Sequence, residues 1–307
     1  MDNSGGKQPI LVVGSVGLDD VQTPFGKVNG VLGGSATYFS YAASFFAPVR
    51  MVAVVGEDFS QEHIRLLESR SIALEGLEVR PGKTFRWAGS YEFDLNEAKT
   101  LKTDLNVFQT FQPKIPSAFQ NTPYVFLANI DPELQLSVLE QIKSPKLVGC
   151  DTMNLWINIK KEPLRALLKK VDIFVLNEVE ARMLSGQPSL IKAGRTLITW
   201  GPKRVVIKKG EHGALLFGPN TFFAAPAFPT EEVFDPTGAG DCFAGGFFGY
   251  LARQGGDLSD PLLRQAVIYG SIMASFNVER FSLERLTTLT SPEIDARYRA
   301  FGDLVRF

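Results

Sequence analysis

Histidine and cysteine are scarce in this sequence, and their scarcity excludes several kinds of site. The 307 residues include two histidines and two cysteines. With only His63 and His212, the chain cannot build a multi-histidine metal centre, and a Ser-His-Asp triad is not expected. Cys150 and Cys242 are too few for a disulfide framework, and their apolar surroundings are typical of buried free thiols.

The sequence also lacks a large net charge and any long apolar run. A formal net charge of −1 gives no reason to expect nucleic acid or an anionic membrane as a partner. No apolar run approaches the roughly 20 residues that a membrane-spanning helix needs. The first residues, MDNSGGKQP, contain no apolar signal-peptide core. We therefore expect a cytoplasmic globular protein that acts on small molecules.

Short apolar runs alternate with amphipathic stretches, which is the order of a parallel sheet with helical crossovers. Strands are predicted at Ile10–Val13, Met51–Val55, Tyr124–Leu127, Leu147–Cys150, Ile173–Leu176, Arg204–Ile207 and Ala214–Phe217. Helices are predicted before Pro48 and at about 60–69, 132–141, 163–169, 178–184, 190–199 and 260–276. No repeat or low-complexity linker divides these elements, so residues 1–307 are expected to form a single α/β domain.

Residues 84–108 interrupt this order. The segment alternates aromatic and polar residues, with a turn near Asn96, and it predicts a β-hairpin or a small inserted sheet. An inserted sheet beside the ligand edge of a larger one is a candidate lid. Its aromatic face, which includes Trp87, has two interpretations that the sequence leaves open. It packs on the parent domain or on a second copy in a homodimer, or it stacks against a bound substrate.

The stretch from Phe234 to Leu251, FDPTGAGDCFAGGFFGYL, carries the clearest chemical pattern. Gly238, Ala239 and Gly240 let backbone N–H groups approach a ligand, and an apolar helix follows them. First-turn amides and the helix dipole then favour an anion such as phosphate. Asp241 in the same turn could remove a proton from a hydroxyl that attacks the phosphorus. An acidic residue that only complements the helix dipole would give the same pattern.

Polar residues also follow the predicted strands, at the edge where open α/β sheets bind ligands. Asp19 could accept hydrogen bonds from ligand hydroxyls, and Gly33 and Gly34 would let the backbone come close to a small polar ligand. Asn154 follows another strand and is a further candidate for substrate binding. A solvated loop acid and a helix-start turn are the structural alternatives for these residues.

A second group of strand-end residues suits a nucleotide. Asn177 and Glu180 lie three residues apart, on one face of a helix, and could hold a hydrated Mg²⁺. Lys208 and Gly210 open a turn that could meet phosphates or a ribose, and the connection beginning at Asn277 could border a base. A capped helix and a basic hairpin turn would explain the same residues without a ligand.

Taken together, these motifs resemble the ribokinase-like carbohydrate kinases of the phosphofructokinase-B type, which include adenosine and other nucleoside kinases. The resemblance rests on GG at 33–34, NEVE at 177–180, KKGEHGA ending at 214 and DPTGAGDCFAGG at 235–246, and it spans nearly the whole chain. It implies a three-layer α/β/α domain with a mainly parallel central sheet and a β lid formed by about 15–33 and 84–108. It also implies MgATP as phosphoryl donor and a primary hydroxyl as acceptor.

Position by position, the resemblance gives each residue a role. Asp241 matches the catalytic base, the 238–240 turn matches the anion hole, and Asp19 matches the acid that binds substrate hydroxyls. The residues that match the ATP and Mg²⁺ site are Asn177, Glu180, Lys208, Gly210 and Gly213, although the family commonly has a hydroxyl residue where Lys208 stands.

Two further correspondences concern a cation and the acceptor. Asp235 and Thr237 match a loop that holds a monovalent cation such as K⁺ in many members. The family usually has an asparagine near the substrate where this chain has Tyr38, so the acceptor pocket differs more than the phosphoryl-transfer machinery.

The sequence therefore predicts an ATP-dependent kinase that phosphorylates a primary hydroxyl of a small, ribose- or fructose-like sugar. A ribonucleoside is the alternative acceptor. A catalytically silent relative that only binds ligands is a rival from another class, and the intact Asp241 and anion turn argue against it.

Overall fold

The computed structural model describes residues 7–95 and 98–306, and its largest element is a nine-stranded sheet, sheet A. The strand order is β13-β12-β11-β10-β9-β8-β1-β4-β5. All neighbours from β11 to β5 are parallel, and β12 and β13 are antiparallel additions at one edge. The strands are β1 (Ile10–Val13), β4 (Val49–Gly56), β5 (Ile72–Arg80), β8 (Tyr124–Leu127), β9 (Leu147–Cys150), β10 (Ile173–Asn177), β11 (Arg204–Lys208), β12 (Ala214–Phe217) and β13 (Phe222–Ala225).

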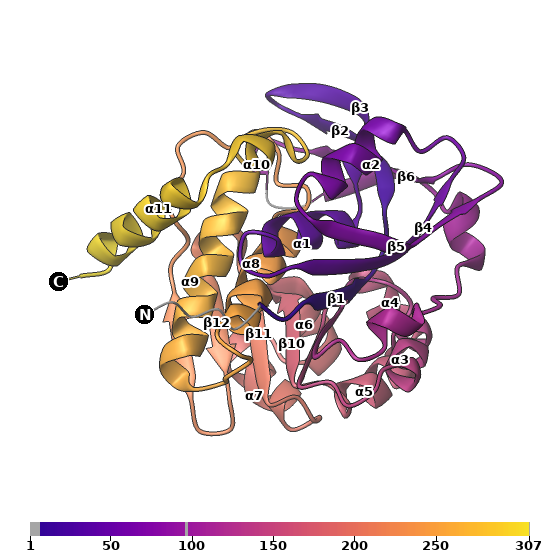
Figure 1. Ribbon diagram of the computed structural model, residues 1–307. Helices are drawn as coiled ribbons and strands as arrows, with labels where there is room; N and C mark the ends of the chain where they lie inside the picture. Colours follow the sequence, from indigo (N-terminus) through magenta and orange to yellow (C-terminus); the bar gives the residue numbers. More distant parts are fainter. Residues whose placement is uncertain (1–6, 96–97, 307) are drawn as a thin grey trace.

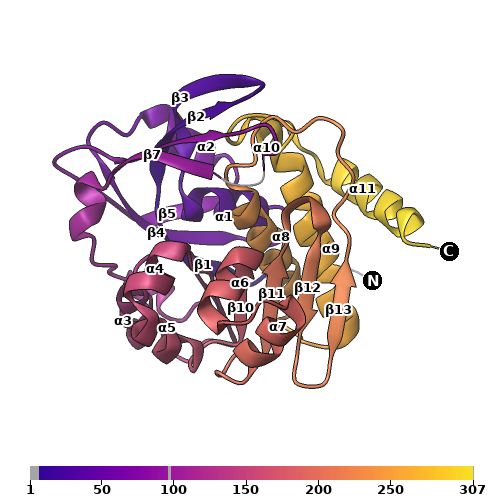
Figure 2. The ribbon, with the colours of Figure 1, turned by 180° about the vertical axis from the view of Figure 1, so that it is seen from behind.

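Helices cover both faces of sheet A, which gives three layers (Figures 1 and 2). One face carries α1 (Ser35–Ala43), α2 (Gln61–Glu68), α8 (Ala239–Arg253), α9 (Asp260–Asn277), α10 (Glu284–Thr288) and α11 (Ser291–Leu304). The other carries α3 (Pro132–Gln141), α4 (Asn154–Ile159), α5 (Lys161–Leu168), α6 (Glu178–Ser185) and α7 (Leu190–Ile198). The predicted three-layer fold is confirmed.

Two hydrophobic cores lie between these layers, because successive side chains of a strand point to opposite faces. In β1, Ile10 and Val12 belong to the core under α1, α8 and α9, whereas Leu11 and Val13 belong to the core under α3 to α7. The strands are therefore continuously apolar, and this is why short apolar runs predicted most of sheet A.

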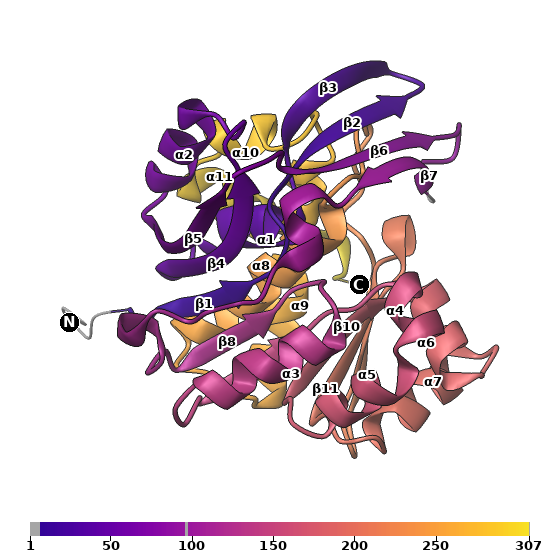
Figure 3. The same ribbon diagram turned by 90° about the vertical axis from the view of Figure 1, so that its right-hand side faces the viewer.

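A second, four-stranded sheet, sheet B, lies over one end of the molecule (Figure 3). Its order is β3-β2-β6-β7, formed by β3 (Gly26–Gly33), β2 (Gly17–Thr23), β6 (Phe85–Tyr91) and β7 (Ala98–Asp104). β2 follows directly from the carboxyl end of β1, so sheet B starts at the ligand edge of sheet A. Asp19 pairs with Trp87 in the parallel β2–β6 ladder, and both side chains therefore project from the same face.

The strand and helix predictions differ from the structure mainly in short or polar elements. The segment after β1 forms β2 and β3, which agrees with the β lid at about 15–33 that the family resemblance implied. The residue pattern alone did not identify these strands, because glycines and acids interrupt their apolar alternation. β5, β13, α4, α10 and α11 were also missed. The predicted turn at Asn96 lies outside the described residues. The homodimer through sheet B stays a prediction.

Across residues 7–95 and 98–306, none of the helices has the length and apolar character that crossing a membrane requires.

Candidate active site

The turn at 238–240 joins the loop after β13 to helix α8 on the carboxyl-end side of sheet A. Gly238 is the N-cap of α8 and has a φ of 75°, a left-handed conformation that favours glycine. A β-carbon added at Gly238 would lie 2.3 Å from the Tyr38 ring, so a side chain there would also clash. Tyr38 on α1 is 1% exposed and packs beneath the turn. Its predicted contact with the acceptor stays a prediction.

The Lys208 ammonium lies beside this turn. Lys208, the last residue of β11, places Nζ 3.2 Å from Asp151 Oδ2 and 3.4 Å from the Gly240 carbonyl oxygen. A β-carbon at Gly240 would approach Nζ to 2.9 Å. The structure therefore puts a positive charge next to the backbone amides that the sequence predicts as an anion hole.

Asp151 is a member of this site that the sequence did not assign. It follows β9 directly, is 4% exposed and accepts hydrogen bonds from Lys208 and from the Thr152 backbone N–H. Its position at a strand end beside a predicted ligand residue was the available signal. The sequence contained no indication that β9 and β11, which flank β10, bring Asp151 to Lys208.

Asn177 and Glu180 form a capping box at the start of α6. The Asn177 side chain accepts from the Glu180 N–H at 2.8 Å, and the Glu180 carboxylate accepts from the Asn177 N–H at 2.7 Å. The helix cap that the sequence also allowed is therefore present, and the Mg²⁺ role of these two residues stays a prediction. Glu180 also lies within electrostatic reach of Lys208, Asp151 and Asp241, so the box fixes a carboxylate at the edge of the same site.

Carboxylates dominate the electrostatics of the site. Burial raises the pKa of Asp241 from 3.8 to about 8, and the charge of Asp151 adds to this, while Lys208 opposes it. Burial and Asp151 likewise raise the pKa of Glu180 from 4.5 to about 8. Burial would lower the pKa of Lys208, but the surrounding acids, Asp151 first, raise it. A strongly perturbed carboxylate beside an anion turn fits a proton-transfer site.

Asp19, on β2 of sheet B, is the residue that the sequence predicts to bind acceptor hydroxyls. It is 3% exposed, and burial, with Asp235 and Asp20, raises its pKa from 3.8 to about 7. A β-carbon on Gly33 would lie 1.9 Å from Asp19 Oδ2, so glycine at 33 is required for this packing. Trp87 is half-buried beside Asp19 in the ladder, with Nε1 donating to Thr100 Oγ1 at 3.2 Å.

The loop containing Asp235 and Thr237 is held by hydrogen-bond donors. Asp235 Oδ1 accepts from the Thr237 N–H at 2.8 Å, and Oδ2 accepts from the Ser282 N–H at 3.1 Å. The Asn277 side-chain amide donates to the Thr237 carbonyl oxygen at 2.8 Å. Each of these oxygens accepts one hydrogen bond and keeps a further lone pair that a cation could use. The monovalent-cation role of Asp235 and Thr237 stays a prediction.

The remaining predicted residues stand at helix ends or in a turn. Asn277 is 1% exposed and supports the turn from beneath. Gly34 is the N-cap of α1, and Asn154 is exposed at the start of α4. Gly210 and Gly213 bound a short 3₁₀ turn between β11 and β12. Their predicted contacts with ATP or the acceptor stay predictions.

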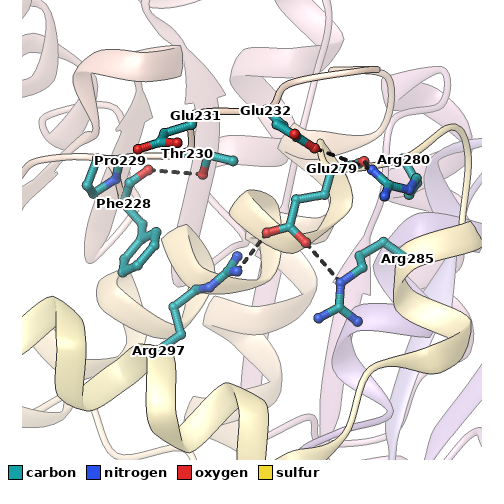
Figure 4. A pocket seen from close by; sticks show the side chains of 9 residues that line it. All are labelled: Phe228, Pro229, Thr230, Glu231, Glu232, Glu279, Arg280, Arg285 and Arg297. Atoms are coloured by element: carbon teal, nitrogen blue, oxygen red, sulfur yellow. Dashed lines mark hydrogen bonds and ion pairs between the residues drawn. The ribbon is translucent and has the colours of Figure 1, made fainter.

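A separate hollow of about 330 Å³ lies between the loop 228–232 and the end of α9 (Figure 4). Glu279 lies between two arginines there, with Arg285 Nε at 2.9 Å and Arg297 at 2.6 Å. Arg280 lies 3.9 Å from Glu232. Each arginine is therefore matched by a glutamate, and the cluster braces the C-terminal helices against the loop that leads to Asp235.

A protein family and several individual proteins are similar to this chain over most of its length. The pfkB family carbohydrate kinases match residues 11–287. The chain is 33% identical to a cytidine kinase of Thermococcus kodakarensis over 80% of this chain and 88% of that protein. It is 28% identical to a deoxyribokinase of Salmonella typhi over 75% of this chain and 76% of that protein.

Among solved structures, a putative ribokinase II from E. coli in complex with ATP and Mg²⁺ has a similar fold. The TM-score is 0.78 at 19% identity, over 95% of this chain and 99% of that one. The chain belongs to the pfkB family of carbohydrate kinases. It is a phosphotransferase with an alcohol group as acceptor, either a sugar or a nucleoside kinase.

Proposed function

We propose that this pfkB family kinase transfers the γ-phosphoryl group of MgATP to a primary hydroxyl on the ribose of a nucleoside. The observation that carries the proposal is the convergence of Asp241, the 238–240 turn and Lys208 at the start of α8. A base, a set of backbone donors and a fixed ammonium in one place are what phosphoryl transfer requires.

The residues present fit ATP. A side chain on Gly240 would enter the space beside Lys208 Nζ, and the first-turn N–H groups of α8 face a phosphate with the dipole behind them. In this proposal Lys208 leaves Asp151 to contact a phosphate oxygen. Gly210, Gly213 and Asn277 border the rest of the nucleotide.

The residues also fit Mg²⁺ bound together with the phosphates. No group of three or more histidine, cysteine, aspartate or glutamate residues in 7–95 and 98–306 is arranged to hold a metal by itself. Mg²⁺ keeps several waters and is usually held by one or two carboxylates plus phosphates, which suits Glu180 with Asn177. When bound, it would neutralise charge on the phosphate oxygens.

Asp241 performs the proton transfer. Its ionised carboxylate takes the proton of the acceptor hydroxyl as the hydroxyl oxygen forms a bond to the γ-phosphorus. The bond from that phosphorus to the oxygen shared with the β-phosphate breaks, and ADP leaves. The turn amides and Lys208 stabilise charge on the transferring group throughout.

The acceptor lies under sheet B. Asp19 accepts hydrogen bonds from vicinal hydroxyls, and the Gly33–Gly34 backbone closes on the sugar from below. Trp87, on the same face of sheet B, offers an aromatic surface on which a base can stack. We place a nucleoside first because the cytidine kinase is 33% identical over most of this chain.

A free pentose is the second candidate, and the 28% identical deoxyribokinase favours it. The two acceptors share the hydroxyl contacts of Asp19 and differ in the base. Trp87→Leu separates them, since it should raise KM for a nucleoside and leave KM for a pentose unchanged.

The test is a phosphorylation screen with MgATP over pentoses, hexoses and nucleosides, with product identified by mass. We expect 5′-phosphorylated nucleoside, and rates measured with and without K⁺ test the predicted cation role of Asp235 and Thr237. Asp241→Asn is the matched inactive control. If no acceptor is phosphorylated although ATP binds, the ligand-binding relative becomes the better explanation.

A further inference from the structure

Sheet B makes a hydrogen bond with the loop that leads into the anion turn. Tyr91 is the last residue of β6, and its hydroxyl lies 3.2 Å from Thr237 Oγ1. The two residues are 146 positions apart in the chain. Thr237 directly precedes Gly238, the N-cap of α8. The end of one sheet B strand therefore contacts the residue next to the phosphate cradle.

The β2–β3 hairpin contacts the same loop from another side. Phe25 at the hairpin tip has its ring centroid 5.6 Å from that of Phe234. The Ser282 hydroxyl donates to the Leu32 carbonyl oxygen at 2.5 Å, and the Ser282 N–H holds Asp235. Two separate segments of sheet B thus engage the loop 234–237 and its support.

Thr237 connects Tyr91 to the anion turn through its hydrogen bonds. Its N–H donates to Asp235, its carbonyl accepts from Asn277, and its hydroxyl is the group that reaches Tyr91. All of its polar backbone and side-chain groups are engaged, so Thr237 has little freedom while Tyr91 is in place. Loss of the Tyr91 contact frees the hydroxyl and loosens the residue that sets the position of Gly238.

We propose that Tyr91 is a positioning residue that fastens sheet B to the anion turn, so that the cradle is aligned only when the acceptor is covered. The inference rests on the proposed function and goes beyond it, because it links the acceptor half of the site to the donor half. Tyr91 acts through Thr237 and does not itself contact the reacting atoms.

The Tyr91 contact also controls whether water reaches the γ-phosphate. A cover that stays fastened excludes water from the γ-phosphate, and a cover that loosens admits water as a competing acceptor. The product of that competition is ADP and inorganic phosphate, formed when water takes the place of the acceptor hydroxyl. The ratio of phosphorylated acceptor to ADP therefore reports the Tyr91 contact more directly than the rate does.

The experiment compares Tyr91→Phe, which removes only the hydroxyl, with Tyr250→Phe. The Tyr250 hydroxyl on α8 donates to Gln265, far along the helix from the turn, and this hydrogen bond is partly buried like that of Tyr91. We expect Tyr91→Phe to lower kcat roughly two- to tenfold, as the loss of one hydrogen bond does. The ratio of phosphorylated acceptor to ADP should fall as well, and Tyr250→Phe should change neither.

A double variant tests the path through Thr237. Thr237→Val removes the other partner, and Tyr91→Phe/Thr237→Val should be no worse than the more damaged single variant, because both remove the same bond. Additive losses, or a wild-type ratio in Tyr91→Phe, overturn the proposal.

Amide hydrogen exchange measures how rigid the turn is, and it does not depend on catalysis. Exchange at 237–240 should be faster in Tyr91→Phe than in Tyr250→Phe, with other helices unchanged. If the wild-type protein phosphorylates no acceptor, the proposed function has failed, and exchange alone then decides the Tyr91 contact. Unchanged exchange at 237–240 overturns it in that case.

Discussion

The donor and acceptor halves of this site are built in different ways. The proposed donor half is centred on consecutive residues at one helix start, where backbone N–H groups need glycine, and Lys208 joins it from β11. The proposed acceptor half uses side chains from β2, β6 and α1, brought together by sheet B and the helix beneath it. A contiguous, backbone-based site leaves a motif in the sequence, whereas a dispersed, side-chain-based site does not. Substitutions in each half test this difference.

The largest expected effect is on the donor half, at Asp241. Asp241→Asn should keep ATP binding and lower kcat about 10²–10⁴-fold, because the proton of the attacking hydroxyl loses its acceptor. Calorimetric ATP binding and steady-state kinetics measure the two parts. Asp257→Asn, an exposed substitution beyond the other end of α8, is the control. Near-normal turnover in Asp241→Asn would remove Asp241 from the mechanism.

Lys208 should give the next largest effect. Lys208→Met should lower kcat/KM for ATP roughly 10- to 100-fold, as the loss of a charged hydrogen bond to phosphate implies. It leaves Asp151 buried without its cation, so the single variant should also be less stable.

The double variant Lys208→Met/Asp151→Asn separates these two consequences. It should recover stability in thermal melts but not activity. Lys203→Met, which breaks an exposed ion pair with Asp172, is the charge-matched control. Recovered activity in the double variant would mean that Lys208 only neutralises Asp151.

Substitution of Asp19 should weaken binding of the acceptor. Asp19→Asn should raise KM for the acceptor by about tenfold or more and leave KM for ATP unchanged, because it weakens hydrogen bonds from the acceptor hydroxyls. Initial rates with each substrate varied in turn measure both constants. Equal changes in the two constants would show that the halves are not separable in this way.

The pH profile should report the donor carboxylates. Asp241 must be ionised to act as a base, so log(kcat/KM) should fall as the pH drops below about 8, its pKa in the free enzyme. Lys208 lowers that pKa, so Lys208→Met should move the acidic limb to higher pH. A limb that shifts to lower pH in this variant would contradict the assigned electrostatics.

The last prediction concerns the stability of the ligand-free protein, which does not depend on catalysis. The pKa of Asp19 is about 7 in the folded state against an ordinary 3.8, so the folded state binds the proton more tightly. The free energy of unfolding is therefore highest, as far as Asp19 is concerned, below about pH 4, and it falls as the pH rises to about 7. The total fall is up to about 4 kcal/mol, because the ionised carboxylate is buried above that pH.

Asp19→Asn removes this titration. Its stability advantage over the wild-type protein in urea unfolding should therefore grow between pH 4 and pH 7, and Asp257→Asn should show no such trend. A constant difference across that range would indicate that Asp19 is not the group responsible.

Much of sheet A was predictable because its strands are buried on both faces and read as unbroken apolar runs. β2 and β3 were expected only through the family resemblance, since their pairing, rather than an apolar pattern of their own, makes them strands. The residues of the donor turn were predicted individually, whereas Asp151 and Tyr91 were not. Their importance depends on partners 57 and 146 positions away, Lys208 and Thr237.

The sequence by itself determined the family and the α/β fold class, and it predicted the anion turn with Asp241, because glycines and an acid at fixed spacing act through local backbone geometry. Only the tertiary structure decided that Lys208 pairs with Asp151, that the Asp235 loop is closed by N–H donors, and that sheet B reaches Thr237. These contacts join segments that no local spacing relates. Their existence depends on how two sheets and their loops pack together.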